Sequence, residues 1–193
     1  DQVIFSAMDS KDDSVTAAAA YALGNVSVGG MGKLFPVLVE LIKSKPQYQY
    51  HLFLSVKEAL VTVTRDTTQS KAFAAYVDSL TPSLSAAAEV KDEGVRSAVA
   101  QCLGLLTIVD PDKVCPFATL HVPAYLSSRV WSPQVLSLLA GYVKSKSPLS
   151  RGVAIVALRY ALSPLVQWDK LRRYMDDFLT LLRDPDLGVR REA

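Results

Sequence analysis

The sequence has few of the residues that build cross-linked or metal-dependent proteins. Its 193 residues include only two cysteines, Cys102 and Cys115, and two histidines, His51 and His121. Two cysteines without a CxxC pair make no disulfide framework, which favours a reducing compartment. Neither histidine has a Cys, His or carboxylate at the spacing of a zinc site. We therefore expect no metal, no cofactor, and a location in the cytoplasm, the nucleus or both.

Long apolar runs and an excess of one charge are also missing. The longest apolar stretches, Ala98–Val109 and Val153–Leu162, are shorter than the roughly 18 residues that cross a bilayer, and the start of the chain lacks the pattern of a signal peptide. Lys and Arg number 21 against 19 Asp and Glu, with no basic tract suited to phosphate contacts. The sequence predicts neither a membrane partner nor a nucleic-acid partner.

Catalytic motifs are incomplete. Gly29–Lys33 (GGMGK) has Ser27 and Leu34 where a phosphate-binding loop needs Gly and Ser or Thr, so we interpret it as a turn between helices. No GxSxG nucleophile motif occurs. Helix capping and charged helix faces explain the paired carboxylates, which are Asp12–Asp13, Asp176–Asp177 and Asp184 with Asp186. We predict that the protein is not an enzyme; an α-helical enzyme would need a pocket of converging polar groups.

Apolar residues at helical spacing are abundant, and 50% of the residues are hydrophobic. Three stretches show the pattern clearly, and it predicts amphipathic helices there. Their expected buried residues are 52, 56, 59, 60 and 63 in the first, 95, 98, 99, 102, 103 and 106 in the second, and 171, 174, 175, 178, 179 and 182 in the third. Val61–Thr64 has strand propensity, but it continues the first stripe and is predicted to be helical.

Similar turn sequences recur between these helices. Asp12–Val15, Asp92–Arg96 and Asp186–Arg190 each place an acidic residue before a valine. The acidic residue can cap the next helix, and the valine is expected to begin its buried stripe.

The length of the repeat can be measured from the first inward-facing residue of the second helix in each helix pair. These residues, which we call anchors, are separated by 37, 43, 55 and 39 residues, and they are Val15, Leu52, Val95, Ser150 and Val189. Three intervals are close to the roughly 40–47 residues of HEAT and armadillo units. The sequence therefore predicts an all-α, HEAT/armadillo-type α-solenoid of stacked antiparallel helix pairs. We expect one array over residues 1–193, cut from a longer solenoid.

The interval of 55 residues contains an irregular segment, residues 114–134, with three prolines and no helical stripe. Removing it brings the interval close to the others. It is either an inserted loop or a retained intron. A retained intron fits the ends of the segment, because every Val codon begins with GT and a Gln codon can be CAG, as the two ends of an intron require. Sequencing the mature transcript decides between the two.

Four strings in order along the chain resemble one HEAT family, the cullin-associated, neddylation-dissociated exchange factors (the TIP-type cullin partners). The strings are Ala20–Gly29 (AYALGNVSVG), Gln49–Leu52 with Ser55–Glu58 (QYHL, SVKE), Ala100–Pro111 (AQCLGLLTIVDP) and Asp184–Arg191 (DPDLGVRR). The ordered set is similar to the later part of the family's solenoid. Residues 114–134 have no counterpart in it.

The resemblance implies a non-catalytic scaffold that wraps an unmodified cullin–RING protein and promotes exchange of substrate receptors in SCF-type ubiquitin ligases. It also implies that this portion faces the N-terminal region of the cullin, with the adaptor-displacing element further along. We therefore expect this chain to make part of the contact with the cullin and not to carry the full exchange activity. The alternative is a generic HEAT scaffold, such as a transport receptor or a phosphatase scaffold subunit, which shares the turn chemistry but not the ordered strings.

Second helices line the concave side of HEAT stacks, so their outward polar residues are the candidate partner-binding residues. They are Lys57, Glu58, Arg96, Gln101, Arg151 and Arg159. Such a row could meet an acidic partner, although solvated helix charges are the more ordinary interpretation. Arg96, Arg151 and Arg190 share one repeat position, where an arginine could instead bridge to the Asp of the preceding unit.

Overall fold

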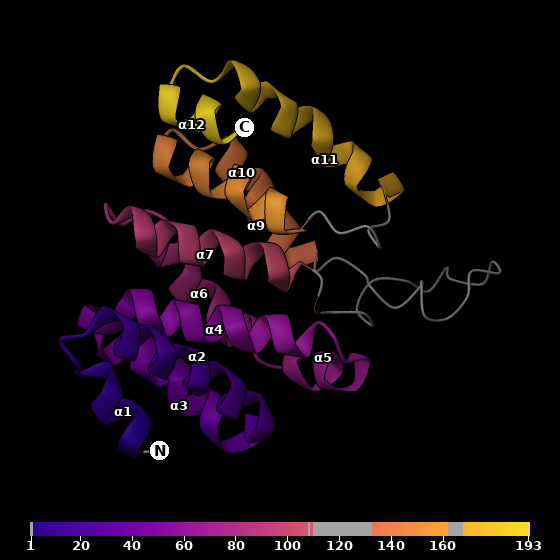
Figure 1. Ribbon diagram of the computed structural model, residues 1–193. Coiled ribbons are helices and arrows are strands. Elements are labelled where there is room, and N and C mark those ends of the chain that lie inside the picture. Colours follow the sequence, from indigo (N-terminus) through magenta and orange to yellow (C-terminus); the bar gives the residue numbers. More distant parts are fainter. Residues whose placement is uncertain (1, 108, 110–132, 162–167) are drawn as a thin grey trace.

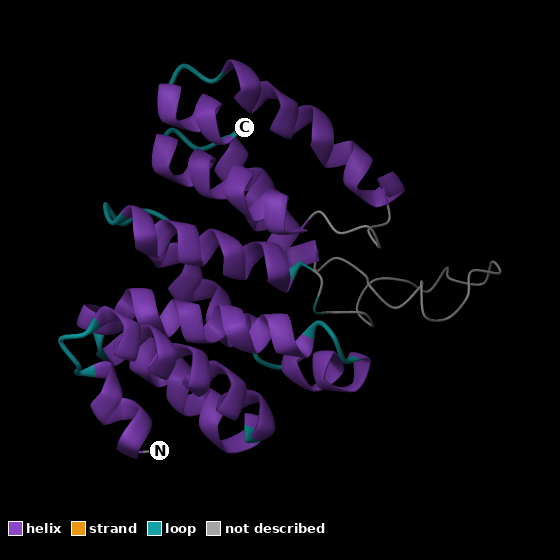
Figure 2. Ribbon diagram, viewed as in Figure 1, coloured by secondary structure: helices purple, strands orange, loops and turns teal. Residues whose placement is uncertain are grey.

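The computed structural model describes residues 2–107, 109, 133–161 and 168–193. Helices make up all the regular structure in these residues (Figure 2). Their bounds are α1 (Gln2–Met8), α2 (Asp13–Gly29), α3 (Met31–Ser44), the 3₁₀ turn η1 (Pro46–Tyr48), α4 (Gln49–Val63), α5 (Thr67–Ala74), α6 (Val77–Ala87), α7 (Glu93–Leu106), α9 (Pro133–Val143), α10 (Pro148–Ala161), α11 (Trp168–Thr180), the 3₁₀ turn η2 (Leu181–Arg183) and α12 (Leu187–Glu192). The predicted all-α class is confirmed.

The helices stack in two layers from the N-terminus to the C-terminus (Figure 1). In the second-helix layer, α2 packs on α4, α4 on α7, α7 on α10, and α10 on α12. The first-helix layer contains α1, α3, α5 with α6, α9 and α11. Each first helix and the second helix that follows it form one unit, as the solenoid prediction requires. Second helices contact one another more extensively than first helices do.

Buried apolar side chains between the layers form one continuous core. The predicted stripes of α4 and α7 are all buried, and α4 extends to Val63 as the stripe predicts. The prediction for the last stripe was wrong at Leu179 and Leu182, which are each 51% exposed, whereas Leu181 is buried. The chain tightens into η2 at Leu181, and this changes which side chains point inward.

The turns are built largely as the sequence predicts. Asp12, Asp92 and Asp186 cap their helices by accepting hydrogen bonds from the backbone N–H groups of Ser14, Val95 and Val189 at 2.9, 2.9 and 3.1 Å. Hydrogen bonds from Ser14 hold the pKa of the Asp12 carboxyl below its usual value. Gly30 is the single residue between α2 and α3. The predicted turn is therefore present at Gly30, whereas Gly29 ends α2 and Met31–Lys33 begin α3.

One anchor differs from its prediction. Val95 and Val189 are buried, but Val15 is 42% exposed and Thr16 is buried in its place. The Thr16 hydroxyl donates to the carbonyl oxygens of Ser10 and Asp12 at 3.3 and 3.1 Å. These bonds turn Thr16, and not Val15, toward the preceding turn.

Two glycines allow second helices to approach closely. A Cβ atom at Gly24 would lie 2.4 Å from the Ser55 carbonyl oxygen of α4, and one at Gly104 would lie 2.3 Å from the Ala157 carbonyl oxygen of α10. No side chain fits in either place, so glycine sets the spacing of these two helix pairs.

The segment 114–134 lies outside the described residues except for Pro133 and Gln134, which begin α9. Cys115 and His121 also lie outside them. The choice between an inserted loop and a retained intron stays a prediction.

Candidate functional site

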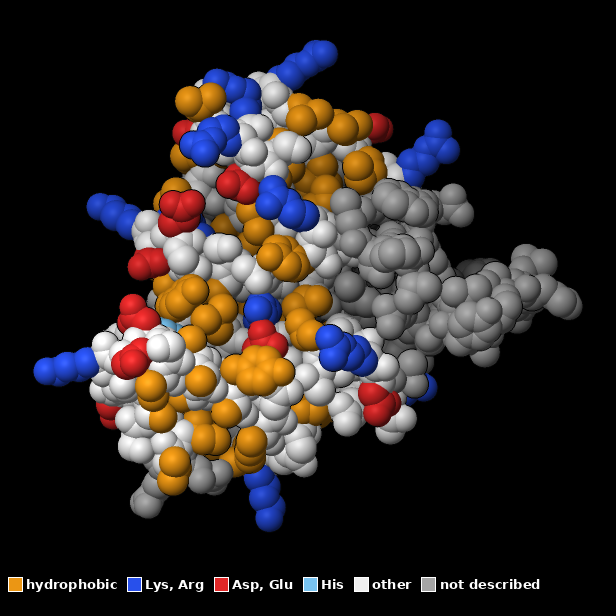
Figure 3. Space-filling view, in the orientation of Figure 1, with side chains coloured by type: hydrophobic (Ala, Val, Ile, Leu, Met, Phe, Trp, Pro, Cys, Tyr) orange, Lys and Arg blue, Asp and Glu red, His pale blue; other side chains and the backbone are white. Residues whose placement is uncertain are grey.

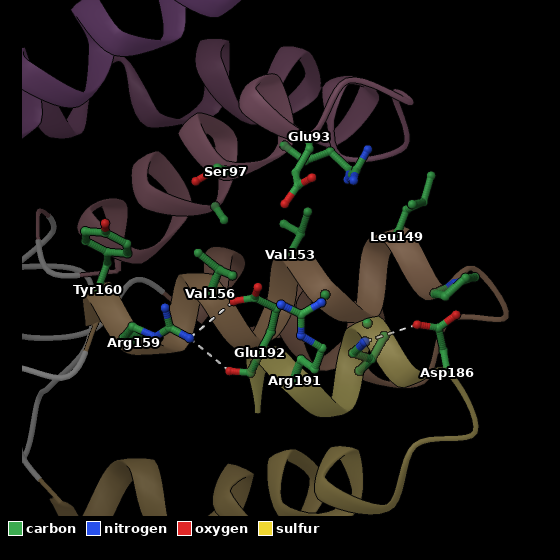
Figure 4. A pocket seen from close by; sticks show the side chains of 16 residues that line it. Glu93, Ser97, Leu149, Val153, Val156, Arg159, Tyr160, Asp186, Arg191 and Glu192 are labelled. Atoms are coloured by element: carbon green, nitrogen blue, oxygen red, sulfur yellow. Dashed lines mark hydrogen bonds and ion pairs between the residues drawn. The ribbon is translucent and has the colours of Figure 1, made fainter.

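A groove of about 580 Å³ opens between α7, α10 and α12 (Figure 4). Its floor is apolar, with Ala100 from α7 and Val153 and Val156 from α10. Its rims are polar, with Glu93 and Ser97 on the α7 side and Arg159, Arg191 and Glu192 on the side of α10 and α12. An apolar floor between charged rims is the pattern of a surface that binds another protein.

Small residues keep the groove open. Val189 is buried and fixes the short helix α12 in place. Gly152 lies in the N-terminal half of α10, and a Cβ atom there would meet no atom within 4 Å. Because α10 has no side chain at this position, the space above it stays empty.

The charges on the rims are of both signs, and only some are paired. Arg159 donates from Nη2 to the backbone oxygen and carboxylate of Glu192 at 3.0 and 3.3 Å. Glu93 and Arg191 are exposed and form no ion pair with the described residues. The face seen in Figure 3 likewise mixes apolar, acidic and basic side chains, without one dominant sign of charge.

Three arginines at one repeat position bind the turn that precedes their own helix. Nη1 of Arg96 donates to the carbonyl oxygens six and five residues earlier at 2.8 and 2.6 Å. Nη1 of Arg151 makes the same two bonds at 2.9 and 3.0 Å, and Nη1 of Arg190 makes them at 2.5 and 3.0 Å. These guanidinium groups close the turns, which is a structural role.

Arg151 also joins two units. Its Nε and Nη2 donate to the two carboxylate oxygens of Asp184 at 2.6 and 2.9 Å, and Asp184 is buried. The bonds from Arg151 hold the pKa of the Asp184 carboxyl below its usual value, and Asp184 raises the pKa of Arg151. From the sequence, we predict a bridge to the preceding unit and a capping role for Asp184. Both expectations were wrong, because the turn before α12 brings Asp184 back against α10.

Two of the six predicted binding residues line the groove. Arg96 and Arg159 line the groove, whereas Lys57, Glu58, Gln101 and Arg151 do not. Lys57 pairs with Glu58 at 2.7 Å, and Gln101 donates to the Ser97 hydroxyl at 3.3 Å. Their part in partner binding stays a prediction.

Sequence reasoning missed Glu93, Ser97, Tyr160 and Arg191. A signal for part of this set was present, because the residue two places after an anchor lines the groove in three successive units. These residues are Ser97, Gly152 and Arg191.

Other chemistry-bearing residues have local partners. No group of three or more His, Cys, Asp or Glu side chains in the described residues could hold a metal ion. The His51 ring packs edge-on against Tyr50 at 5.1 Å. The Cys102 thiol is buried, donates to the Phe53 carbonyl at 3.3 Å, and has a pKa raised by burial, so it is not activated. Asp177 pairs with Lys144 at 2.9 Å.

Among the described residues, no helix combines the length and hydrophobicity that a membrane-spanning segment needs.

Comparison with curated proteins shows similarity along nearly the whole chain. The chain is 30% identical to Cullin-associated NEDD8-dissociated protein 2 of Mus musculus over 98% of its residues. Over the full length of this chain, it is 29% identical to Cullin-associated NEDD8-dissociated protein 1 of Drosophila melanogaster. It is 33% identical over 96% of its residues to the protein named Cullin-associated NEDD8-dissociated protein 1, C-terminal part, of Emericella nidulans. No family model matches the chain.

The chain spans 13–16% of the length of these three relatives. The resemblance read from the four ordered strings is confirmed by these matches, and the match to a C-terminal part is consistent with a later portion of the solenoid.

Proposed function

We propose that this chain is a non-catalytic, cullin-binding part of a solenoid that takes part in the assembly and substrate-receptor exchange of cullin–RING ubiquitin ligases. The observation that supports this most directly is the similarity to cullin-associated proteins along the whole chain. An unmodified cullin–RING scaffold in the cytoplasm or nucleus is the partner we propose.

The geometry supports binding over an extended surface. The second helices form a continuous layer, and the groove opens on two boundaries between units. Its charged side chains, such as Glu93, Arg159 and Arg191, lie on the rims in contact with solvent. Exposed rim charges guide association and set orientation, whereas catalysis by carboxylates needs groups with shifted pKa values in a cleft.

The fold supplies the rigidity that such a surface needs. Gly24 and Gly104 hold neighbouring helices in close contact, and Arg151 with Asp184 joins two successive units. These contacts fix the spacing of the second helices, so the backbone positions that would face a partner are set before binding. Pre-ordering lowers the entropic cost of association.

Binding of the purified full chain to a purified cullin–RING scaffold tests the proposal. Surface plasmon resonance should give tighter binding to the unmodified scaffold than to the same scaffold carrying its ubiquitin-like modifier. Absence of binding to the unmodified scaffold, or equal affinity for both forms, would contradict the proposal.

A second measurement concerns exchange. A fluorescent adaptor–receptor module is bound to the unmodified scaffold, and its dissociation rate is followed with and without the chain. We expect the chain to bind without displacing the module, since the adaptor-displacing element of the family lies further along the solenoid. Rapid displacement by this chain alone would show that the division of roles is wrong.

A further inference from the structure

Large apolar side chains are exposed mainly at the two ends of the stack. Ten such side chains are exposed among the described residues, and eight of them belong to the first three helices or to the last three elements. The eight are Val3, Val15, Tyr21, Val26 and Val37 near the N-terminus, and Leu179, Leu182 and Leu187 near the C-terminus. These two sets lie at opposite ends of the molecule (Figure 1). Exposed apolar surface that gathers in one region marks interaction sites in soluble proteins.

The exposed face of α2 corresponds to a face that is buried in the later second helices. Counted from the anchors, positions 0, 3, 7 and 11 of α4, α7 and α10 are all buried. In α4 this face lies against Gly24 of α2, at Ser55 and Ala59. In α10 it lies against Gly104 of α7, at Ala157. The same positions of α2, which we call the α2 stripe, are Val15, Ala18, Ala22 and Val26.

Three residues of the α2 stripe are exposed and Ala22 is half-buried. The stripe is apolar throughout, and Tyr21 beside it is also exposed. In each later unit, the same positions pack against the second helix that precedes them. The α2 stripe therefore has the composition and the spacing of a surface that packs on another unit of this kind.

The C-terminal end presents apolar residues at positions that earlier units use for packing. Leu182 lies seven residues before its anchor and is exposed, whereas the equivalent residues Ala88 and Val143 are buried. Leu187 lies two residues before its anchor and is also exposed. The equivalent residue of α4, Tyr50, reaches the start of α7 in the next unit. Leu187 is therefore placed to contact a unit that follows α12.

The charges at the two ends are complementary. Nε and Nη2 of Arg151 bind Asp184 of the next unit, while its Nη1 binds its own turn. Arg190 makes the same turn bonds through Nη1, and no described partner is found for its Nε and Nη2. The nearby carboxylates of Asp184 and Glu192 are already paired with arginines of α10. At the other end, residues 9–13 carry three aspartates and one lysine.

We propose that copies of this chain associate head to tail, with the C-terminal end of one copy packed on the N-terminal end of the next. The exposed leucines of one copy pack on the α2 stripe of the other at Val15 and Ala18, and Arg190 meets the acidic turn at residues 9–13. A second copy fits both ends, because the contact repeats the boundary between successive units of the chain. Since the two surfaces differ, association does not close at a dimer and extends into short open chains. No cullin takes part, so the proposal stands apart from the proposed function.

Sedimentation velocity of the purified full chain tests the proposal. Because α12 has only six residues, the contact covers less surface than a boundary within the chain, and small interfaces associate weakly. We expect the weight-average sedimentation coefficient to rise roughly 1.3-fold or more between about 5 and about 500 μM protein. A coefficient that stays at the monomer value over this range would overturn the proposal.

One substitution blocks each end. Ala18→Glu places a charge within the α2 stripe, and Leu187→Glu places a charge on the C-terminal end. Both residues are exposed, so each variant should melt close to wild type. Each variant alone should stay monomeric, because burying an unpaired carboxylate in the contact is costly. Ala86→Glu is the matched control at an exposed position of α6 and should associate as wild type does.

A 1:1 mixture of the two end variants distinguishes a head-to-tail contact from a contact between like ends. The C-terminal end of the Ala18→Glu chain and the N-terminal end of the Leu187→Glu chain are both intact, so the mixture should form a dimer that does not extend. A contact between two N-terminal ends would let Leu187→Glu dimerise by itself, and a contact between two C-terminal ends would let Ala18→Glu do so. Association of either variant alone, or a mixture that stays monomeric, would overturn the proposal.

Discussion

The boundary between α7 and α10 and the boundary between α10 and α12 join successive units of one stack by different contacts. At the first, the backbone of Gly104 lies directly against α10. At the second, Arg159 occupies the position that Gly104 has in its own helix, nine residues after the anchor, and reaches across to Glu192.

The turns at the two boundaries also differ in how they join the next unit. Arg96 and Arg151 make identical pairs of bonds to their own turns. Only Arg151 also makes a buried ion pair with the next unit. Its partner Asp184, in the turn before α12, stands at the repeat position that Ser145 occupies in the turn before α10. One boundary therefore depends on close packing and the other on charge, and the two should respond differently to substitution, pH and salt.

The largest effect is expected at the packed boundary. Gly104→Ala places a methyl group against the Ala157 carbonyl oxygen, so α7 and α10 must separate, and we expect a loss of about 3 kcal/mol in unfolding free energy. Urea unfolding followed by circular dichroism measures it. Gly152→Ala is the control, since its Cβ meets nothing and helix propensity should make it neutral or stabilising by up to about 1 kcal/mol. Equal stability of the two variants would show that the first boundary does not depend on close approach.

The next effect compares the two arginines. Arg151→Ala removes two turn bonds and leaves the Asp184 carboxylate without its cation, for an expected loss of about 2 kcal/mol. Arg96→Ala removes only turn bonds, for an expected loss of about 1 kcal/mol. Thermal melting of both variants measures the difference, and similar losses would remove the distinction between the turns.

Charge reversal at Arg96 separates its structural role from a binding role. Arg96→Glu should lower the melting temperature, because a carboxylate cannot donate to the turn carbonyl groups. Unchanged melting with lost cullin binding would instead identify Arg96 as an interface residue.

A smaller effect is expected from acid. Because the pKa of Asp184 is lowered in the folded chain, the unfolded chain binds a proton at this carboxylate at a higher pH than the folded chain does. The stability from this carboxylate is present above its unfolded pKa of about 3.9 and is lost as pH falls through the lower folded pKa. The difference in unfolding free energy between wild type and Asp184→Asn should therefore shrink as pH falls from 6 toward 2. A constant difference over that range would contradict an ionic boundary.

The smallest effect is expected at Arg159. Its side chain is 59% exposed and that of Glu192 is 43% exposed, so Arg159→Ala should cost less than about 0.5 kcal/mol. Melting at low and high salt measures it. A loss as large as that of Arg151→Ala would show that exposure does not separate these two contacts.

The helices were predictable because their apolar stripes repeat along the chain. The stripes of α4 and α7 and the Asp caps of α2, α7 and α12 follow from local spacing and local hydrogen bonds. The errors came where a side-chain hydrogen bond to a turn or a tighter helical turn changed the inward direction. Thr16 replaced Val15 because its hydroxyl bonds the preceding turn, and η2 turned Leu181 inward in place of Leu182.

The groove was only partly predictable. Arg96 and Arg159 were identified as outward polar residues, but so were Lys57 and Glu58, which lie outside it and pair with each other. Helical spacing gives the outward face of one helix. It does not give the distance between neighbouring helices, and that distance decides where a groove opens.

The sequence by itself determined the all-helical class, the repeat, the turn chemistry and the resemblance to cullin-associated proteins, because each depends on residues near one another in the chain. Tertiary structure alone decided that Arg151 joins Asp184 of the following unit and that Glu93 faces Arg191 across a groove. These relations depend on how closely successive helices stack, which is set by side-chain volume at contacts such as Gly104 with α10. Gly104 and Ala157 are 53 positions apart and Arg151 and Asp184 are 33 positions apart, and no local pattern records such contacts.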